Sequence, residues 1–396
     1  MKHRDTFFLY LIFFPAGLGI LSNPQRYPEL KNQLHLSNGE FGTYISLVGI
    51  GSVICFILGS RMIHSIGIGR TFLIAMVGLY SSVAAIPHVH SPRSFIWVNI
   101  IFGFMSTLMH ISMNAQGIHA QHKLGRLILP FLAGMWSAGA VSASLISSLV
   151  SKKLTLAWHM DLVAAIAFII AIIGLIGSRN DLLKPQEEYE AAPRISFKNI
   201  MATFKFVPAL SFGHILIVQS EFSAADWSAI YARNTIGVSV AQSSLCYLVF
   251  MITMASLRLA GHRINHRYSE QTLIKWVPRI GAVGFGAFIL LATTIASEHR
   301  ALAFVSSLLA YAFLGFGNSF MVLLIFGIAA RKTNVMPSVV IASLGLVGAS
   351  LSFVAKFIIS WVAQATNLTV ALLIPTLMLY AGSVLYKYGS EKPKLY

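Results

Sequence analysis

The sequence predicts an all-α integral membrane protein with twelve transmembrane helices, arranged as two pseudo-symmetric six-helix bundles. Long apolar runs, a scarcity of charge and an internal repeat lead to this fold class. Of 396 residues, 56% are hydrophobic and only 11% are charged, whereas soluble domains carry about 25% charged residues. Each apolar run approaches about 20 residues, the length that crosses a hydrocarbon core of about 30 Å. The composition therefore excludes a soluble protein with one large hydrophobic core.

Twelve apolar runs follow one another along the chain. We expect all of them to be helices, because only a helix satisfies its own backbone hydrogen bonds in lipid at this length. The runs cover residues 6–23, 41–60, 70–87, 94–120, 127–150, 156–178, 203–224, 240–260, 273–296, 300–329, 338–363 and 367–386.

The internal repeat is a short basic motif that occurs twice, 202 residues apart. Gly59–His64 and Gly261–His266 both read Gly-x-Arg-(Met/Ile)-x-His. A repeat with a period near half the chain length indicates two similar halves. We expect each copy on a short basic turn between two spans, in contact either with lipid phosphates or with helix C-termini of the opposite half. The residues assigned to this conformational loop are Gly59, Arg61, His64, Arg70, Gly261, Arg263 and His266.

A polar segment near the middle of the chain sets the predicted domain bounds. Residues 179–200 are rich in charge and proline, a composition that does not pack a core and predicts a partly disordered cytoplasmic linker. The linker separates an N-terminal bundle, residues 1–178, from a C-terminal bundle, residues 201–396. The net charge of +16 fits cytoplasmic loops enriched in Lys and Arg, with both termini in the cytoplasm. No nucleic-acid partner is expected.

The span at 94–120 carries a stripe of polar and small residues on one helical face. Their spacing of three and four residues keeps them together. The stripe either packs against another helix through small residues or lines a water-filled cavity, with His110 and Asn114 reaching solute. Asn318 has a nearly matching place in the second half, and Trp136 suits either sugar-ring stacking or tight packing. The stripe consists of Asn99, Gly103, Ser106, His110, Asn114, Gly117 and Gln121.

Charged residues inside spans are functional candidates, because burying a charge in lipid is expensive. Glu221 and Lys356 lie at similar predicted depth in the outer half. They either form a structural ion pair, or Lys356 extends alone to the interface, or Glu221 takes up a proton and couples it to solute movement. Asp226 and Trp227 follow at the outer end of their span. Arg258 is expected to extend to the inner interface.

Motifs that support other functions are missing from the sequence. It has no Walker A loop, His-Glu-x-x-His or Gly-x-Ser-x-Gly motif, which argues against an ATP-driven pump or a membrane enzyme. His119 and His122 have the spacing of neighbours on one helical face, but no acidic residue or cysteine lies near them in the sequence to complete a metal site. We therefore expect no enzyme activity, no cofactor and no metal.

The span count, the central linker and the repeated motif resemble the major facilitator superfamily. Within it, the chain is most similar to the fucose-permease-like branch and its uncharacterised bacterial inner-membrane relatives. Two departures are the lack of an acidic residue between Gly59 and Arg70, and Gly348-Ala349-Ser350 in place of a Gly-Pro pair. The segments that carry the branch resemblance are Met113–Gly117, Leu124–Arg126, Met135–Gly139 and Asp226–Ser228, together with Glu221.

The resemblance implies a monomeric secondary transporter in the bacterial inner membrane, moving a small polar, sugar-like organic solute by alternating access. A proton or sodium ion would drive it, through Glu221 and Lys356. Alternatives are a drug or metabolite exporter and, given the missing acid near His64, a non-transporting sensor on the same scaffold. A central site lined by spans one, four, seven and ten is expected. Its predicted solute-binding residues are His110, Asn114, Gln116, Trp136, Asp226, Trp227 and Asn318.

Overall fold

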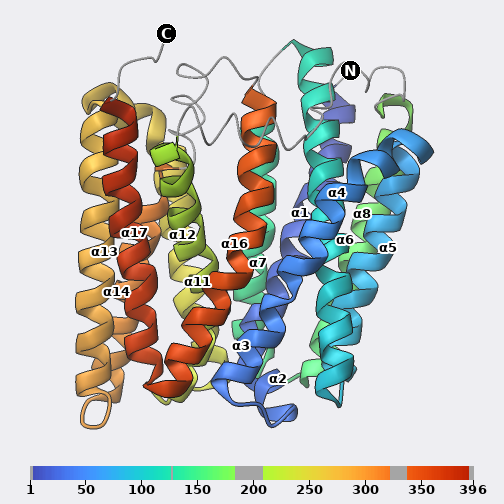
Figure 1. The fold of residues 1–396 in the computed structure, drawn as a ribbon. Helices are drawn as coiled ribbons and strands as arrows, with labels where there is room; N and C mark the ends of the chain where they lie inside the picture. Colours follow the sequence, from blue (N-terminus) through green and yellow to red (C-terminus); the bar gives the residue numbers. More distant parts are fainter. Residues whose placement is uncertain (1–2, 126–127, 183–207, 322–336, 392–396) are drawn as a thin grey trace. The chain divides into compact units, whose positions relative to one another are not determined.

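The computed structural model describes residues 3–125, 128–182, 208–321 and 337–391, and these residues form helices and turns without a strand (Figure 1). The chain divides into two compact units, Met1–Ala192 and Pro193–Tyr396. The division falls within the predicted linker at 179–200, most of which lies outside the described residues. The predicted partial disorder of the linker therefore stays a prediction.

The long helices of the first unit pack in two groups. Helix α1 packs against α7 and α8, whereas α6 packs against α4 and α5. Contacts between α5 and α8 connect the two groups. The bounds are α1 His3–Gln25, α2 Tyr27–Gln33, α3 Asn38–Ser46, α4 Val48–Ile66, α5 Ile68–Ala85, α6 Pro92–Leu124, α7 Leu129–Val150 and α8 Leu156–Ser178, with 3-10 turns at Ile86–His88 and Arg179–Asp181.

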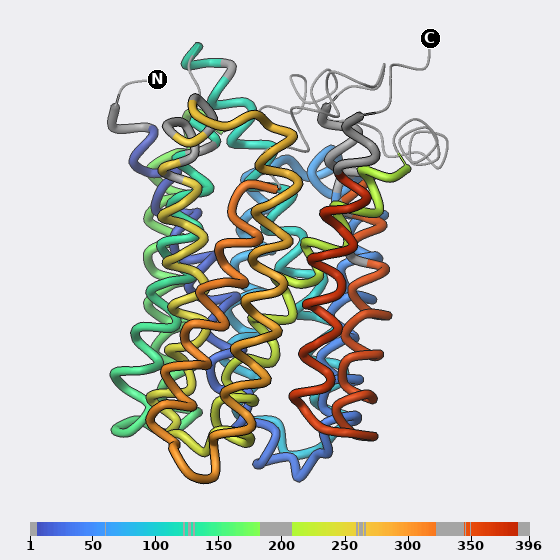
Figure 2. Tube along the Cα trace, turned by 90° about the vertical axis from the view of Figure 1, so that its left-hand side faces the viewer, coloured from blue at the N-terminus to red at the C-terminus, as the bar shows by residue number. Residues whose placement is uncertain are grey.

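The second unit is organised around α11, which packs against α12, α14, α16 and α17. Helices α13 and α14 form an antiparallel hairpin, whose orange turn lies at the bottom of Figure 2. Helix α13 also packs along α17. The bounds are α11 Pro208–Asn234, α12 Val240–Arg267, α13 Glu270–Ile295, α14 Arg300–Asn318, α16 Pro337–Ala365 and α17 Leu368–Glu391.

The long helices confirm the predicted fold class. The described residues contain twelve helices of 18 or more residues, six in each unit. Eleven stretches among them are long and apolar enough to cross a membrane. Helix α11 is as long as the others but falls outside this group, because it carries Glu221, Asp226 and other polar residues among its apolar ones. The helix around which the second unit is organised thus carries two acidic residues within its length.

The prediction that the two basic motifs form turns is wrong, because both motifs are helical. Helix α4 continues through Arg61 and His64 to Ile66, and α12 likewise continues past its own copy of the motif to Arg267. Neither motif contains a glycine or proline after its first residue, so nothing stops the helix where the apolar run ends. The turn after α4 is made by Gly67 alone, at φ 79° and ψ 157°.

Glycines bring helix backbones of the first unit into direct contact. A Cβ on Gly17 would lie 2.1 Å from the carbonyl oxygen of Trp136, and a Cβ on Gly139 would lie 2.0 Å from that of Phe14. These positions hold α1 against α7. Gly103 meets the carbonyl oxygen of Val48 in the same way, at 2.0 Å, and holds α6 against α4. Close approach through small residues is how membrane helices associate without a hydrophobic driving force.

Candidate functional site

Helix α11 presents polar side chains to several neighbours at the middle of the second unit. Its polar run includes Gln219, Ser220, Glu221 and Asp226. Residues five apart on a helix are turned by about 140° from one another, so Glu221 and Asp226 face different helices. Each carboxylate has its own cationic partner.

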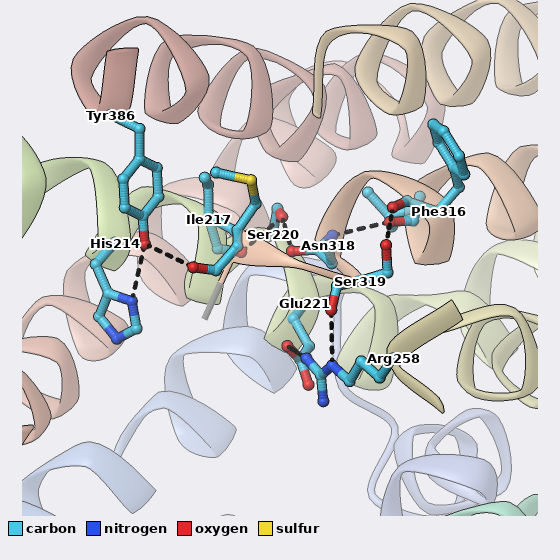
Figure 3. A network of polar contacts seen from close by, with 11 residues as sticks. His214, Ile217, Ser220, Glu221, Arg258, Phe316, Asn318, Ser319 and Tyr386 are labelled. Carbon is cyan, nitrogen blue, oxygen red and sulfur yellow. Dashed lines mark hydrogen bonds and ion pairs between the residues drawn. The ribbon is translucent and has the colours of Figure 1, made fainter. Parts of the chain in front are cut away.

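Glu221 is paired with Arg258 of α12 (Figure 3). The carboxylate Oε2 and the guanidinium Nη2 are 3.5 Å apart, with 19% and 26% of the two side chains exposed. Arg258 is also held at the C-terminal end of α14, because its Nε donates a hydrogen bond to the carbonyl oxygen of the capping residue Ser319 at 3.1 Å. Arg258 therefore lies inside the unit, and the expected extension to the interface is wrong.

Asp226 is paired with Lys356 of α16. Lys356 Nζ lies 2.8 Å from Asp226 Oδ2, and only 16% and 5% of the two side chains are exposed. The ammonium also lies 6.0 Å from the centroid of the Phe222 ring. The alternatives in which Lys356 pairs with Glu221 or extends alone to the interface are both wrong.

The length of α11 explains why Lys356 pairs with Asp226 and not with Glu221. The predicted span ended at residue 224, which placed Asp226 beyond the helix. The helix instead runs to Asn234, because no glycine or proline follows residue 224 until after that point. Asp226 then lies eight residues before the end of α11, and Lys356 lies nine residues before the end of α16 at Ala365. The two charges are therefore at matching depth.

Asn318 and Trp227 are packed within the second unit. Asn318 is fully buried at the end of α14. Its Oδ1 lies 3.1 Å from the Ser220 hydroxyl, and its Nδ2 donates to the carbonyl oxygen of Leu314 (Figure 3). Trp227 is also fully buried, and its Nε1 has no hydrogen-bond partner among the described residues. Asn318 therefore joins α14 to α11, and Trp227 is buried within the second unit.

Two further contacts fix α11 against the last helices. His214 Nδ1 lies 3.2 Å from the Tyr386 hydroxyl of α17, which lies 3.5 Å from the carbonyl oxygen of Met321 (Figure 3). Gln219 Nε2 donates to the carbonyl oxygen of Gly348 in α16 at 3.2 Å. Polar contacts thus hold α11 to α12, α14, α16 and α17.

In the first unit, the rings of His110 on α6 and Trp136 on α7 lie beside each other in a tilted arrangement. Their ring centroids are 5.8 Å apart, with the planes inclined by 52°. The buried Nε1 of Trp136 has no hydrogen-bond partner among the described residues. Asn114, one turn beyond His110, is exposed. Trp136 from α7 provides an aromatic surface, and α6 provides a ring nitrogen at His110 and an amide at Asn114.

Gln116 differs from the other predicted solute ligands of the first unit. It is buried, and its Nε2 donates to the carbonyl oxygen of Asp181 at 2.9 Å. Lys123 pairs with the carboxylate of the same Asp181 at 2.7 Å. Gln116 therefore ties α6 to the turn that follows α8.

The stripe along α6 serves several purposes. Gly103 and Gly117 contact neighbouring helices, and Gln121 accepts hydrogen bonds from the backbone N–H groups of Ile128 and Leu129. The packing interpretation thus holds for the ends of the stripe. His110 and Asn114 remain its candidates for solute contact.

The basic motifs place charge at the ends of α4 and α12. Gly59 packs against Cys55, Leu108 and Ile111, whereas Arg61, His64 and Arg70 are exposed. The side chains of Arg263 and His266, with the surroundings of Gly261, lie outside the described residues. The choice between lipid contact and contact with the opposite half stays a prediction.

A family model described as Major Facilitator Superfamily matches residues 7–355. The chain belongs to the major facilitator superfamily. An uncharacterised transporter of this superfamily from Yersinia pestis is 25% identical over 363 residues, which cover 91% of this chain and 89% of that protein. Membrane protein MosC of Rhizobium meliloti is 23% identical over 366 residues, 91% of this chain and 84% of the relative.

Solved structures of other transporters share the fold. The nucleoside transporter NupG aligns with a TM-score of 0.72 at 14% identity, over 99% of this chain and 100% of its own. The D-xylose-proton symporter aligns with a TM-score of 0.71 at 15% identity, over 99% and 98%. At these identities the likeness concerns the fold alone. The resemblance to the superfamily is confirmed, and this transporter is a membrane-spanning carrier of small-molecule solutes.

Proposed function

We propose that this superfamily member is a secondary active transporter that moves a small polar organic solute by alternating access, with a proton carried by Glu221. The observation that carries the proposal is the pair of ion pairs on α11, Glu221 with Arg258 and Asp226 with Lys356. Charges within a membrane span are costly, and they mark ion pathways and proton relays.

The two ion pairs differ in geometry, and this difference supports a different role for each. Glu221 and Arg258 are 3.5 Å apart and partly exposed, and Arg258 has a second anchor at Ser319. Glu221 can therefore take up a proton while Arg258 stays in place. Asp226 and Lys356 are closer and more buried, which favours a structural role. Relative to the sequence-based assignment, Arg258 replaces Lys356 as the partner in ion coupling.

Neutral hydrogen-bonding groups support a polar, uncharged solute. His110 and Trp136 form an aromatic pair, and Asn114 offers both a donor and an acceptor. Aromatic faces and amides suit the rings and hydroxyl groups of a sugar or nucleoside. The names of two structural neighbours, a nucleoside transporter and a D-xylose-proton symporter, specify solutes of this kind.

The proposal also includes the membrane in which the transporter lies and the side on which its termini lie. The relatives are bacterial proteins, which supports the bacterial inner membrane. The excess of Lys and Arg in alternate short loops supports cytoplasmic termini. The transporter acts as a monomer in this proposal.

Transport by reconstituted protein tests the role of Glu221. Proteoliposomes are assayed with radiolabelled D-xylose, L-fucose and uridine, both for counterflow and for accumulation driven by a pH gradient. Glu221→Gln is expected to keep counterflow and lose accumulation, because it retains shape but carries no titratable proton. Glu298→Gln, in the exposed turn after α13, is the matched control and should keep both activities.

The two failures of this experiment have different meanings. If Glu221→Gln accumulates solute as wild type does, Glu221 is not the proton carrier. If wild-type protein exchanges none of the solutes while remaining folded, the solute class is wrong and the non-transporting sensor gains support.

A further inference from the structure

Two basic and two aromatic residues gather where α13 and α17 pack together in the second unit. Lys275, Trp276 and Arg279 lie on α13, and Tyr380 and Ser383 lie on α17. We name these five residues the α13–α17 basic patch. Neither the motifs found in the sequence nor the proposed transport site includes them.

Hydrogen bonds fix the position of Arg279 within the patch. Its Nε donates to the Ser383 hydroxyl at 3.2 Å, and that hydroxyl donates to the carbonyl oxygen of Ile274 at 3.0 Å. The guanidinium carbon lies 5.5 Å from the centroid of the Tyr380 ring. An arginine has five N–H donors, and the four on the two η nitrogens of Arg279 form no hydrogen bond to a described residue.

The patch has no counter-ion among the described residues. Arg258 and Lys356 each have a carboxylate within 3.5 Å, but no described carboxylate forms an ion pair with Lys275 or Arg279. The nearest acid before Arg279 along α13 is Glu270, nine residues earlier, or roughly 13 Å along the helix axis. Two cations in the N-terminal half of a membrane span thus lack an anionic partner among the described residues.

The surroundings of the patch are apolar and exposed. On α13, Trp276, Ile280 and Val283 are 50%, 45% and 63% exposed, with a spacing that keeps them on one face. On α17, Leu377 and Tyr380 are 67% and 43% exposed. Exposed apolar side chains on a membrane-spanning helix face lipid, and tryptophan and tyrosine prefer the headgroup level. The cations therefore lie beside lipid, near its polar boundary.

We propose that the α13–α17 basic patch binds the phosphate of an anionic phospholipid in the leaflet at the N-terminal end of α13. The free η nitrogens of Arg279 form a pair of parallel hydrogen bonds to two phosphate oxygens, the geometry that guanidinium and phosphate groups favour. The Lys275 ammonium lies 4.6 Å from the Trp276 ring centroid and supplies a second positive charge. Basic pockets between transmembrane helices recognise lipid headgroups by this chemistry.

Lipid-dependent thermal stability of the full-length protein tests this site. Delipidated protein in a neutral detergent is melted with phosphatidylglycerol, with phosphatidylcholine, or with inorganic phosphate. Phosphatidylglycerol is expected to raise the Tm of the wild type by several degrees, and the other two should give less than half that shift. Arg279→Gln should lose most of the phosphatidylglycerol shift. Arg300→Gln, an exposed arginine at the opposite end of the unit, makes the same charge change and should keep it.

Each of three results would overturn the proposal. An equal shift for Arg279→Gln and Arg300→Gln would show that only general charge matters. An equal shift from inorganic phosphate would identify a free anion as the ligand. If Arg279→Gln is not recovered as folded protein, Lys275→Gln carries the test. It is expected to lose part of the shift, and full retention would also reject the site.

Discussion

The ammonium of Lys356 and the carboxylate of Asp226 lie 2.8 Å apart and join α16 to α11. Both side chains are largely buried, with 16% and 5% exposed. In such a setting each charge is tolerated because the other is present. Removal of one partner leaves an uncompensated charge, whereas removal of both leaves two polar but neutral groups.

Asp226→Asn is therefore expected to destabilise the second unit strongly. Loss of one partner from a buried ion pair costs about 3–5 kcal/mol, here because Lys356 remains charged without its carboxylate. Lys356→Gln should have a similar effect for the converse reason. Thermal melts of detergent-solubilised protein, followed by the loss of monodisperse material, measure the change.

The double variant Asp226→Asn with Lys356→Gln is the control for this pair. It should recover at least half of the stability that Asp226→Asn loses, because neither charge then remains buried alone. A double variant as unstable as the sum of the two single ones would mean that the two side chains are not energetically coupled.

The ion pair between Glu221 and Arg258 should respond unevenly to mutation. Glu221→Gln leaves Arg258 bonded to the carbonyl oxygen of Ser319, so its cost should be smaller than that of Asp226→Asn. Arg258→Gln removes donors from both Glu221 and Ser319, and a buried polar group left without its partner costs about 1–3 kcal/mol. The same melts should rank Glu221→Gln as the more stable variant, and the reverse order would contradict the double anchoring of Arg258.

The helices were predictable from sequence because length and apolar composition decide them. A run of about 20 apolar residues in lipid has few alternatives to a helix. The helix ends were less predictable, because a fall in hydropathy ends the membrane-facing part of a helix without ending its hydrogen bonding. This is why α4 and α12 continue through their basic motifs, and why α11 continues past Asp226.

Partners within the candidate site depend on which helices are neighbours, and a single sequence does not encode this locally. Glu221 and Lys356 were natural partners by predicted depth, but α12 supplies Arg258 to the same helix. Gln116 and Trp227 carry suitable chemistry for solute binding, yet one bonds to the turn after α8 and the other is fully buried. Residue type thus indicated which helices carry the candidate site, but it did not indicate which side chains contact each other there.

Close packing of α1 against α7 predicts a sharp contrast between two glycines of α7. A Cβ at Gly139 would lie 2.0 Å from the carbonyl oxygen of Phe14, whereas nothing lies within 4 Å of one at Gly134. Gly139→Ala should force the helix backbones apart, at a cost of about 1–3 kcal/mol typical of overpacking. Gly134→Ala should be neutral or stabilising by about 0.5–1 kcal/mol, because alanine favours the helix.

Thermal melts of the two alanine variants at equal detergent concentration compare these effects directly. The two proteins differ from wild type by the same methyl group on the same helix, so helix propensity cancels between them. Equal stability of the two variants would contradict the backbone contact at Gly139.

The turn between α4 and α5 gives a prediction that depends on backbone conformation alone. Gly67 has φ 79° and ψ 157°, a region that essentially only glycine adopts and that costs other residues about 1–3 kcal/mol. Gly67→Ala and Gly67→Asn should therefore lower the melting temperature to a similar degree. Asparagine relieves strain in the ordinary left-handed helical region, but the extended ψ of Gly67 lies outside it. A clearly more stable Gly67→Asn variant would place this residue in the left-handed helical region instead, and would contradict the one-residue turn that lets α4 keep its basic motif helical.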